Sequence, residues 1–474
     1  MTDVFRRTLL VASVVVVVAG VALIDRTVAV SPPPTSQAQL DSGVTQVAAA
    51  GVESSAWYCT GGSGASGGAP AKVLLSNVGA SAVSGTLTAF SSSGVSGKFP
   101  VYVPAHASST LVPAGLVPGA WVAATIELDG GSVGATEEVS GPQGWSEAPC
   151  ASSTSSSWYF SHGSTLGNDD LELSLFNPTA TSSSVDVDLV TTVSGALQPP
   201  AYQEIQVPAR SVVNESLADH AQQDPATATE VFALSGSVVA TELEMTGQAP
   251  ASGLSLMLGT PSPAASWSVP ISTLPAQGRI AFHVFNPSGE LANVDVVVKT
   301  SEQTSSPLIV PVKPDSATTI FANSIPFVSP GVPFTASFQS RNGVGVVVDR
   351  QVVAAPESQV PQRGTVPAVS SSSDQWLVPH LIGPGTGPGK LAIQNVSGRP
   401  IRVTVYASGS SGLVEVANLS ARTLEPGTVL VDGPTPPPPS ADLVVEASGP
   451  VNVELDTNKV GAAGVVVAPA LPMG

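Results

Sequence analysis

The stretch Phe282-His-Val-Phe-Asn286-Pro-Ser288 is one copy of a pattern that recurs along the chain and indicates its architecture. It is a short apolar run that ends at an asparagine, and four such runs occur along the chain. Each asparagine follows a tryptophan by 19 or 20 residues. Four copies in the same order and at nearly the same spacing indicate an internal repeat. The tryptophans are Trp57, Trp158, Trp267 and Trp376, and the asparagines are Asn77, Asn177, Asn286 and Asn395.

The segments after each asparagine have the pattern of strands and turns. Val185-Asp-Val-Asp-Leu189 and Ile401-Arg-Val-Thr-Val405 alternate apolar and polar residues, which is the period of a half-buried strand. A proline turn and a glycine-led strand complete each copy. We therefore predict an all-β fold of tandem, Ig-like β-sandwich modules. The alternative is one continuous body, such as a propeller with split blades.

The repeat spacing predicts four modules joined by polar connectors. Residues 25–56 are polar and proline-led, which predicts a flexible stalk, and the serine-rich residues 357–375 predict a linker. The expected β-sandwich modules cover residues 57–150, 158–260, 267–356 and 376–470.

The N-terminus has the features of an export signal. Arg6 and Arg7 precede an uncharged run over residues 8–24. At about 1.5 Å per residue, this run nearly spans a bilayer as a helix. We predict a single-pass signal-anchor, with residues 1–7 in the cytoplasm and the body outside the cell. The alternative is a signal peptide cleaved after Thr27-Val28-Ala29, which would release a secreted protein.

Composition excludes several classes of protein. The 474 residues contain 17 Lys and Arg against 35 Asp and Glu, for a net charge of −18. An acidic chain without a basic footprint is not expected to bind nucleic acid. Only 11% of residues are charged, whereas coiled coils are rich in charged residues. The hydrophobic share of 42% supplies enough apolar surface for packed cores.

The two cysteines, Cys59 and Cys150, bracket the first module. An exported chain with two cysteines most simply forms one disulfide. A metal or redox pair is the alternative, but there is no CxxC and no nearby pair of histidines.

Candidate sites in the sequence are weak. His162 and His380 each follow a repeat tryptophan by four residues, a position where a metal or ligand could bind. The stretch from Asn168 to Glu172 is acidic enough for calcium but lacks the spacing of a calcium loop. No histidine lies in an HExxH motif or beside a plausible nucleophile.

Two further features recur between modules. The glycine-rich stretches 61–68 and 383–389 occupy equivalent places and predict loops at one end of a sandwich that could bind a ligand. An acid six residues after a glycine recurs as Glu137, Glu242 and Asp349. A recurring position favours a role in the architecture of the module over catalysis.

The Trp57-Tyr58-Cys59 opening, the single anchor helix and the Asn-Pro-Thr or Asn-Pro-Ser units resemble a family of exported actinobacterial proteins of unknown function. The units also resemble repeats of bacterial surface proteins, and Asp349-Arg350 fits the acidic-basic pair that ends such repeats. The resemblance implies a cell-envelope location and an association with envelope glycan assembly. It supplies no catalytic residues.

We therefore expect a non-catalytic envelope protein that presents tandem β-sandwich repeats as a binding or scaffold surface. It is expected to need no cofactor or metal. Its partners are the membrane, through residues 8–24, and an unidentified envelope protein or glycan. The alternative is an accessory protein or enzyme of envelope polysaccharide assembly or processing, with two carboxylates as acid and base.

Overall fold

The computed structural model describes residues 45–65, 67–221, 223–248, 251–354, 362–379, 389–434, 442–457 and 466–473. Two units are distinguished, residues 1–41 and residues 42–474. All described residues belong to the second unit, which is all-β, as predicted. Among the described residues no helix is long and apolar enough to cross a bilayer. The predicted tail at residues 1–7 and anchor at residues 8–24 lie outside the described residues.

The first module consists of two four-stranded sheets, β1-β6-β3-β4 and β5-β2-β7-β8. One continuous core joins them, since Trp57 and Leu87 of the first sheet cluster with Val73 and Ala135 of the second. The elements are β1 (Ser55–Ser63), β2 (Ala71–Asn77), β3 (Val83–Ser91), β4 (Ser96–Val103), β5 (Ala107–Leu111), η1 (Pro113–Gly115), β6 (Trp121–Leu128), β7 (Val133–Gly141) and β8 (Gly144–Pro149).

The second module repeats this order. Strands β12-β11-β15-β9 form one sheet, with β13 also paired to β11, and β14-β10-β16-β17 form the other. The elements are β9 (Ser157–Gly163), β10 (Asp170–Asn177), β11 (Ser183–Thr191), β12 (Gly195–Leu197), η2 (Pro200–Tyr202), β13 (Ile205–Val207), β14 (Ser211–Ser216), η3 (Leu217–Asp219), β15 (Thr227–Ser235), β16 (Val239–Gln248) and β17 (Ala251–Leu258).

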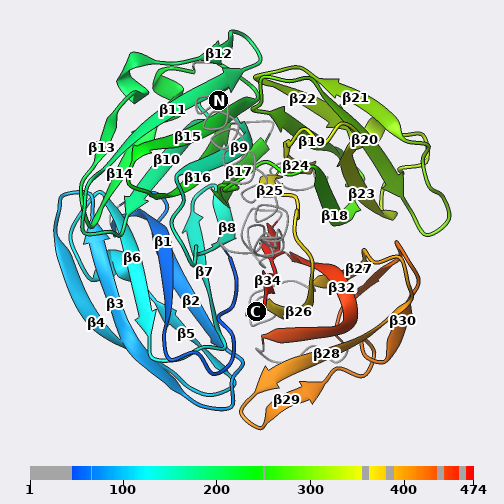
Figure 1. Ribbon diagram of the computed structural model, residues 1–474, viewed down its shortest axis with the longest axis horizontal. Coiled ribbons are helices and arrows are strands. Elements are labelled where there is room, and N and C mark those ends of the chain that lie inside the picture. Colours follow the sequence, from blue (N-terminus) through cyan, green and yellow to red (C-terminus); the bar gives the residue numbers. More distant parts are fainter. Residues whose placement is uncertain are drawn as a thin grey trace, which may run out of the picture. The chain divides into compact units, whose positions relative to one another are not determined.

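The third module contains the sheets β18-β23-β20-β21 and β22-β19-β24-β25. Strands β17 and β25 pair in parallel, so that the second sheets of modules 2 and 3 form one eight-stranded sheet (Figure 1). The elements are β18 (Ser266–Thr273), β19 (Gly278–Asn286), β20 (Ala292–Lys299), β21 (Leu308–Val312), β22 (Ser316–Phe321), η4 (Ala322–Ser324), β23 (Pro333–Ser340), β24 (Val347–Ala354) and β25 (Gln362–Pro367).

In the fourth module one long strand, β32, takes part in both halves. Its first part pairs with β26 and β28, and its second part pairs with β27 and β33. In modules 2 and 3, by contrast, the chain turns from one sheet to the other at a glycine, Gly236 and Gly343, each with φ of +76°. The elements are β26 (Ser373–Val378), β27 (Lys390–Asn395), β28 (Ile401–Gly409), β29 (Gly412–Glu415), β30 (Arg422–Leu424), β31 (Val429–Asp432), β32 (Leu443–Thr457), β33 (Val466–Pro469) and β34 (Leu471–Pro472).

Strand β20 shows why the alternating segments form these sheets. Ala292, Val294, Val296 and Val298 are buried in the core of module 3, and the residues between them are partly exposed. Asp295, on the exposed face, pairs with Arg341 at 2.7 Å. The period of two therefore places one face in the core and one in water, as a β-sandwich requires.

The modules contact one another in a closed cycle. The core of module 2 includes Phe90, Trp121 and Val139 of module 1. The hydroxyl of Ser161 in module 2 bonds to Asp349 in module 3, and Ser268 in module 3 donates to Gln394 in module 4. Asp442 of module 4 accepts hydrogen bonds from Ser76 and Ser108 of module 1. Figure 1 shows the four colour-coded groups of strands following one another in this order.

Two predicted connectors contain packed residues. Within the predicted stalk at 25–56, Val47 is 1% exposed, and its backbone N–H donates to the Pro472 carbonyl at 2.9 Å. Within the predicted linker at 357–375, β25 pairs with both β24 and β17. Polar composition alone does not show that a segment can pair with the edge of a neighbouring sheet.

The disulfide between Cys59 and Cys150 is present, with the Cα atoms 4.6 Å apart. Both residues are buried in the core of module 1. The bond ties the first strand to the end of the module over 91 residues of chain.

Removing this cross-link is expected to lower the stability of the protein. Closure of a loop of this size contributes about 4–5 kcal/mol in the chain-entropy model. The double variant Cys59→Ser/Cys150→Ser should therefore melt at a lower temperature than the oxidised protein in a thermal unfolding experiment. Heating the wild type with a reductant should give the same loss, and the variant should not respond to the reductant. Equal melting of the oxidised and reduced wild type would contradict the prediction.

Candidate functional site

The repeat asparagines tie three segments of each module together. In module 3 the Asn286 side-chain amide donates to the carbonyls of Glu290, Val312 and Lys313 at 2.7, 3.0 and 3.1 Å. Its oxygen accepts from the Ser288 N–H at 3.0 Å. The other asparagines make corresponding bonds to the turn that follows and to the end of a later strand: Asn77, Asn177 and Asn395. These bonds give the asparagine a structural role.

Three of the repeat tryptophans also make equivalent bonds. Each indole N–H donates to the carbonyl of a valine in the same module. This valine lies immediately before, or on, the strand that pairs with the strand ending in the repeat asparagine. The distances are 2.9 Å for Trp158, 2.7 Å for Trp267 and 3.0 Å for Trp376. The Trp57 indole N–H has no hydrogen-bond partner among the described residues. All four side chains are buried.

The recurring acids do not all occupy one position. In each of the first three modules, the residue four positions before the repeat asparagine pairs with a residue on the adjacent strand. That partner is Glu137 in module 1, Glu242 in module 2 and Arg350 in module 3. Module 3 has one more residue between its glycine and this strand, so Asp349 lies one position earlier. Because side chains alternate along a strand, Asp349 projects from the opposite face. The predicted equivalence is therefore wrong for Asp349.

This opposite face carries contacts between modules. At the position of Asp349, module 2 has Thr241, whose hydroxyl lies 2.6 Å from that of Thr60 in module 1. Asp349 itself accepts bonds from the backbone N–H and the hydroxyl of Ser161 at 2.8 and 2.7 Å. In module 4 the corresponding Glu454 forms an ion pair with Arg350. Each of these side chains joins its module to the preceding one.

The junction of modules 2 and 3 buries a cluster of polar side chains. The rings of His162 on β9 and His283 on β19 stack 3.8 Å apart, with an interplanar angle of 13°. Gln351 on β24 contacts the His162 Nε2 atom, and His283 Nδ1 lies 3.1 Å from the Thr319 hydroxyl. His380, the other predicted histidine, lies outside the described residues.

A buried ion network lies on the same eight-stranded sheet. The Arg363 guanidinium contacts Asp169 at 2.9 Å and Glu244 at 3.3 Å. Its partner Asp169 also accepts a bond from the Ser164 hydroxyl. Glu242 is fully buried, and its carboxylate oxygens have no hydrogen-bond partner among the described residues.

Burial changes the protonation of these groups. It raises the pKa of Glu137 and of Glu244 to about 7 and that of Asp349 to about 6. It raises the pKa of Glu242 well above the ordinary value. It lowers the pKa of His283 to about 3, because a buried imidazolium would be poorly solvated. Burial therefore favours the neutral forms of these four carboxyl groups and of the His283 imidazole.

The structure shows the surroundings of the acidic stretch and of the first glycine-rich stretch. Within the acidic stretch at Asn168–Glu172, the Asp169 carboxylate is held in an ion pair with the Arg363 guanidinium. Among the described residues, Cys59, Glu137 and Cys150 are the one group with the proximity of metal ligands, but the sulfurs form a disulfide. Gly61 packs against the Val122 carbonyl and donates to Glu137 at 2.8 Å, so this glycine is not part of an open binding loop. The second stretch, at 383–389, lies largely outside the described residues.

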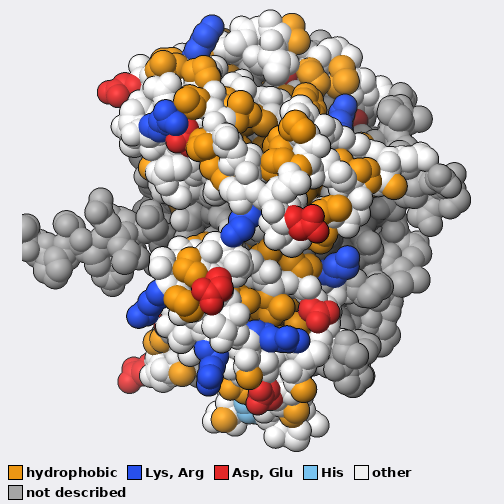
Figure 2. Space-filling model, turned by 90° about the vertical axis from the view of Figure 1, so that its right-hand side faces the viewer, with side chains coloured by type: hydrophobic (Ala, Val, Ile, Leu, Met, Phe, Trp, Pro, Cys, Tyr) orange, Lys and Arg blue, Asp and Glu red, His pale blue; other side chains and the backbone are white. Residues whose placement is uncertain are grey.

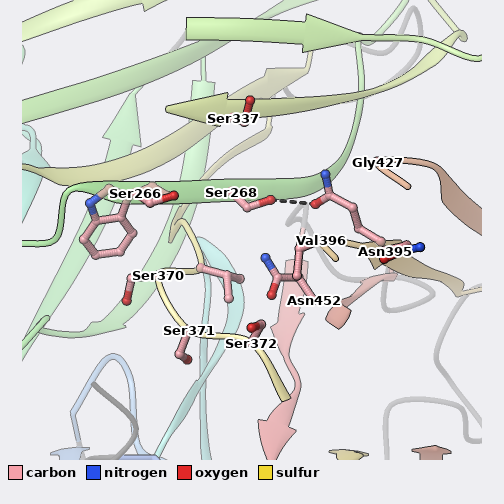
Figure 3. Close-up of a pocket in the computed structure, with 13 residues that line it drawn as sticks. Ser266, Ser268, Ser337, Ser370, Ser371, Ser372, Asn395, Val396, Gly427 and Asn452 are labelled. Atoms are coloured by element: carbon pink, nitrogen blue, oxygen red, sulfur yellow. Dashed lines mark hydrogen bonds between the residues drawn. The ribbon is translucent and has the colours of Figure 1, made fainter. Parts of the chain in front are cut away.

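A cavity of about 300 Å³ lies between modules 3 and 4. The Ser268 hydroxyl on β18 donates to the side-chain oxygen of Gln394 on β27 at 2.6 Å, and Figure 3 draws this bond as a dashed line from Ser268. The lining contains no acidic or basic residue and no histidine. It consists of Ser266, Trp267, Ser268, Ser337, Val369, Ser370, Ser371, Ser372, Gln394, Asn395, Val396, Gly427 and Asn452.

The repeat explains why a cavity exists at this junction. Ser268 directly follows the repeat tryptophan, and Gln394 directly precedes the repeat asparagine. At the junction of modules 2 and 3 the corresponding residues are Tyr159 and Phe285, which pack in one apolar cluster. At the junction of modules 1 and 2 they are Tyr58 and Phe176, again in a shared cluster. Two polar side chains replace the aromatic pair between modules 3 and 4.

Sequence reasoning missed this pair and the contacts of Arg363. The signal for the pair was present in the repeat alignment, since aromatic residues occupy both positions at two junctions (Tyr58 with Phe176, Tyr159 with Phe285), whereas Ser268 and Gln394 occupy them at the third. The signal for Arg363 was absent, because its partners Asp169 and Glu244 are more than 100 residues away in the chain.

A family of unknown function (DUF5719) matches residues 138–412, which is more than half of the chain. The chain belongs to this family. The expected kinship with a family of unknown function is thereby confirmed. No curated protein matches the chain.

Solved structures resemble this DUF5719 protein only distantly. The Anabaena sensory rhodopsin transducer is 20% identical over 18% of this chain and 94% of its own, with a TM-score of 0.16. Thermotoga maritima 1070 is 14% identical over 23% of this chain and 97% of its own, with a TM-score of 0.21. A tetra-tandem repeat from the extending region of a large adhesion protein is 13% identical over 83% of this chain and 92% of its own, with a TM-score of 0.10. These TM-scores are too low to carry an argument.

Replacement of Asn286 by alanine is expected to destabilise the protein. It removes the donor for three buried or partly buried carbonyls, at a cost of about 2–4 kcal/mol. Calorimetric melting should show a clear fall in the melting temperature. Asn293→Ala is the matched control, because the Asn293 side chain has no hydrogen bond among the described residues of the same module. Equal effects of the two substitutions would contradict the role given to Asn286.

Glu242→Gln is expected to change how stability depends on pH. The folded pKa of Glu242 lies above the unfolded value of 4.5, so its contribution to stability is full below about pH 4.5 and is lost as the pH rises. Glutamine stays neutral, and the variant should therefore gain stability relative to wild type between pH 5 and 8. Melting temperatures across this range measure the difference. The exposed Glu204→Gln serves as control, and parallel profiles of wild type and Glu242→Gln would refute the assignment.

Proposed function

We propose that this protein is a non-catalytic, membrane-anchored protein of the cell envelope, in which four Ig-like β-sandwich modules form an extracytoplasmic binding scaffold. Residues 8–24 anchor it, the N-terminus lies in the cytoplasm and the body lies outside. The cavity between modules 3 and 4 is the observation that carries the binding role. Ligand sites commonly combine a concave surface with a few well-placed polar groups.

The electrostatics of the described residues support binding rather than catalysis. Burial raises the pKa values of Glu137, Glu242, Glu244 and Asp349, which are fully buried within modules or at their junctions. The pKa values of Glu172, Glu215 and Glu230 are also raised; these carboxylates are partly exposed, and none of them lines the cavity. Acid-base hydrolysis of a glycan would need two carboxylates facing a common cleft. No carboxylate lines the cavity described above.

The surface also supports this assignment. On the face shown in Figure 2, Lys and Arg side chains are scattered among Asp and Glu, without a continuous basic patch. Nucleic-acid binding would need clustered positive charge. The buried disulfide suits a chain that folds in an oxidising compartment outside the cytoplasm.

Cell fractionation tests the proposed location. A full-length chain with a C-terminal epitope should sediment with membranes, and protease added to intact, wall-permeabilised cells should remove the epitope. A chain that starts at residue 31 should remain in the cytoplasm and be protected. Recovery of the full-length epitope from the culture medium would indicate cleavage of the signal, and recovery from the cytosol would overturn the proposal.

A further inference from the structure

We propose that the cavity between modules 3 and 4 binds an uncharged polyhydroxylated ligand, namely a neutral sugar residue. The inference rests on the binding role proposed above and adds the chemical class of the ligand. It is argued from the lining, from its free hydrogen-bonding groups and from comparison with the other junctions.

The composition of the lining disfavours a charged ligand. None of the 13 lining residues is Asp, Glu, Lys, Arg or His. Lys299 approaches from module 3, but its ammonium group is engaged by the Gly427 carbonyl at 2.8 Å. A charged ligand would lose hydration on entering the cavity without gaining an opposite charge from the lining.

The lining also selects against a purely apolar ligand. The hydroxyls of Ser266, Ser370 and Ser372 form no hydrogen bond with any described residue. The Gln394 side-chain NH₂ is similarly free, because only its oxygen is used by Ser268. An apolar ligand would remove these groups from water without pairing them, which is unfavourable.

Sugar hydroxyls match these free groups. A serine hydroxyl both donates and accepts, and a sugar hydroxyl does the same, so that either can adapt to the other. The free Gln394 NH₂ adds a donor in a fixed place, because Ser268 holds the amide oxygen. Val369 and Val396, which are at least partly exposed, supply apolar surface for the C–H faces of a sugar ring. The volume of about 300 Å³ is at the small end of ligand pockets, which suits one sugar residue.

The elements that form the site are held in place. The Ser268 backbone pairs with Val369 through two hydrogen bonds of 2.8 Å. Asn395 is fixed by the bonds of the repeat, and its backbone pairs with Thr428 and Gly427 at 2.9 Å. A site with fixed polar groups loses little entropy when it binds a ligand.

Binding of sugars to the purified soluble body, residues 42–474, tests the proposal. Saturation-transfer NMR would be recorded with methyl glycosides of neutral hexoses and pentoses, the corresponding free sugars, glucuronic acid and glucosamine. At least one neutral sugar is expected to bind, and more strongly than the charged sugars. Preference for the methyl glycoside would indicate a residue within a glycan, and preference for the reducing sugar would indicate a free monosaccharide.

The double variant Ser268→Tyr/Gln394→Phe provides the site-specific arm. It rebuilds the aromatic pair of the preceding junction and fills the cavity, so that the affinity should fall at least tenfold. Ser194→Tyr, in an exposed loop of module 2, is the matched control and should bind as wild type does. Ser370→Trp, at an exposed position of the lining, blocks the cavity without altering a buried contact and keeps the test decisive if the double variant misfolds.

Each outcome has a defined meaning. Binding that is lost in the filled and blocked variants supports the site. Absence of binding by every neutral sugar, preference for a charged sugar or unchanged binding in the blocked variant overturns it. Because this assay uses the purified body, its failure is distinct from a failure of the envelope location, which fractionation measures separately.

Discussion

The side-chain amide of the repeat asparagine is the interaction on which each module depends. In one module it joins the end of a strand to the turn that follows and to a strand end 26 residues later, as Asn286 does with Glu290 and Val312. The indole of Trp267 bonds to Val346, which lies in register with the same asparagine, and so connects the first sheet to the second. Buried polar groups must be paired, which fixes the spacing between these residues.

Much of the fold within a module could be predicted for this reason. The tryptophan, the asparagine and the alternating strand between two turns each reflect contacts made inside about 100 residues of chain. Period two in β20 identifies the face that is buried, because burial within a module is a local property of the strand. The alternation of apolar and polar residues does not show which modules pack against one another.

The junctions could not be predicted from periodicity. The extra residue between Gly343 and Val346 moves Asp349 to the outer face, where it meets Ser161, and spacing from the glycine alone conceals that shift. The short β25 pairs with the edges of β17 and β24, and β17 lies more than 100 residues away in the sequence. At the junction of modules 2 and 3, His162 and His283 stack as neutral rings, which avoids the cost of burying charge between modules.

In a repeat protein, substitutions at one junction can create a binding site there while other junctions stay packed. Loss of an aromatic pair from a closed apolar core would leave a void, which costs stability in proportion to its volume. Between modules 3 and 4 that cost is reduced, because Ser268 and Gln394 satisfy each other and the exposed serines of the lining admit water. The exposed hydroxyls of the lining are open to a ligand that can both donate and accept hydrogen bonds. The junction of modules 1 and 2, closed by Tyr58 with Phe176, and that of modules 2 and 3, closed by Tyr159 with Phe285, retain their aromatic pairs.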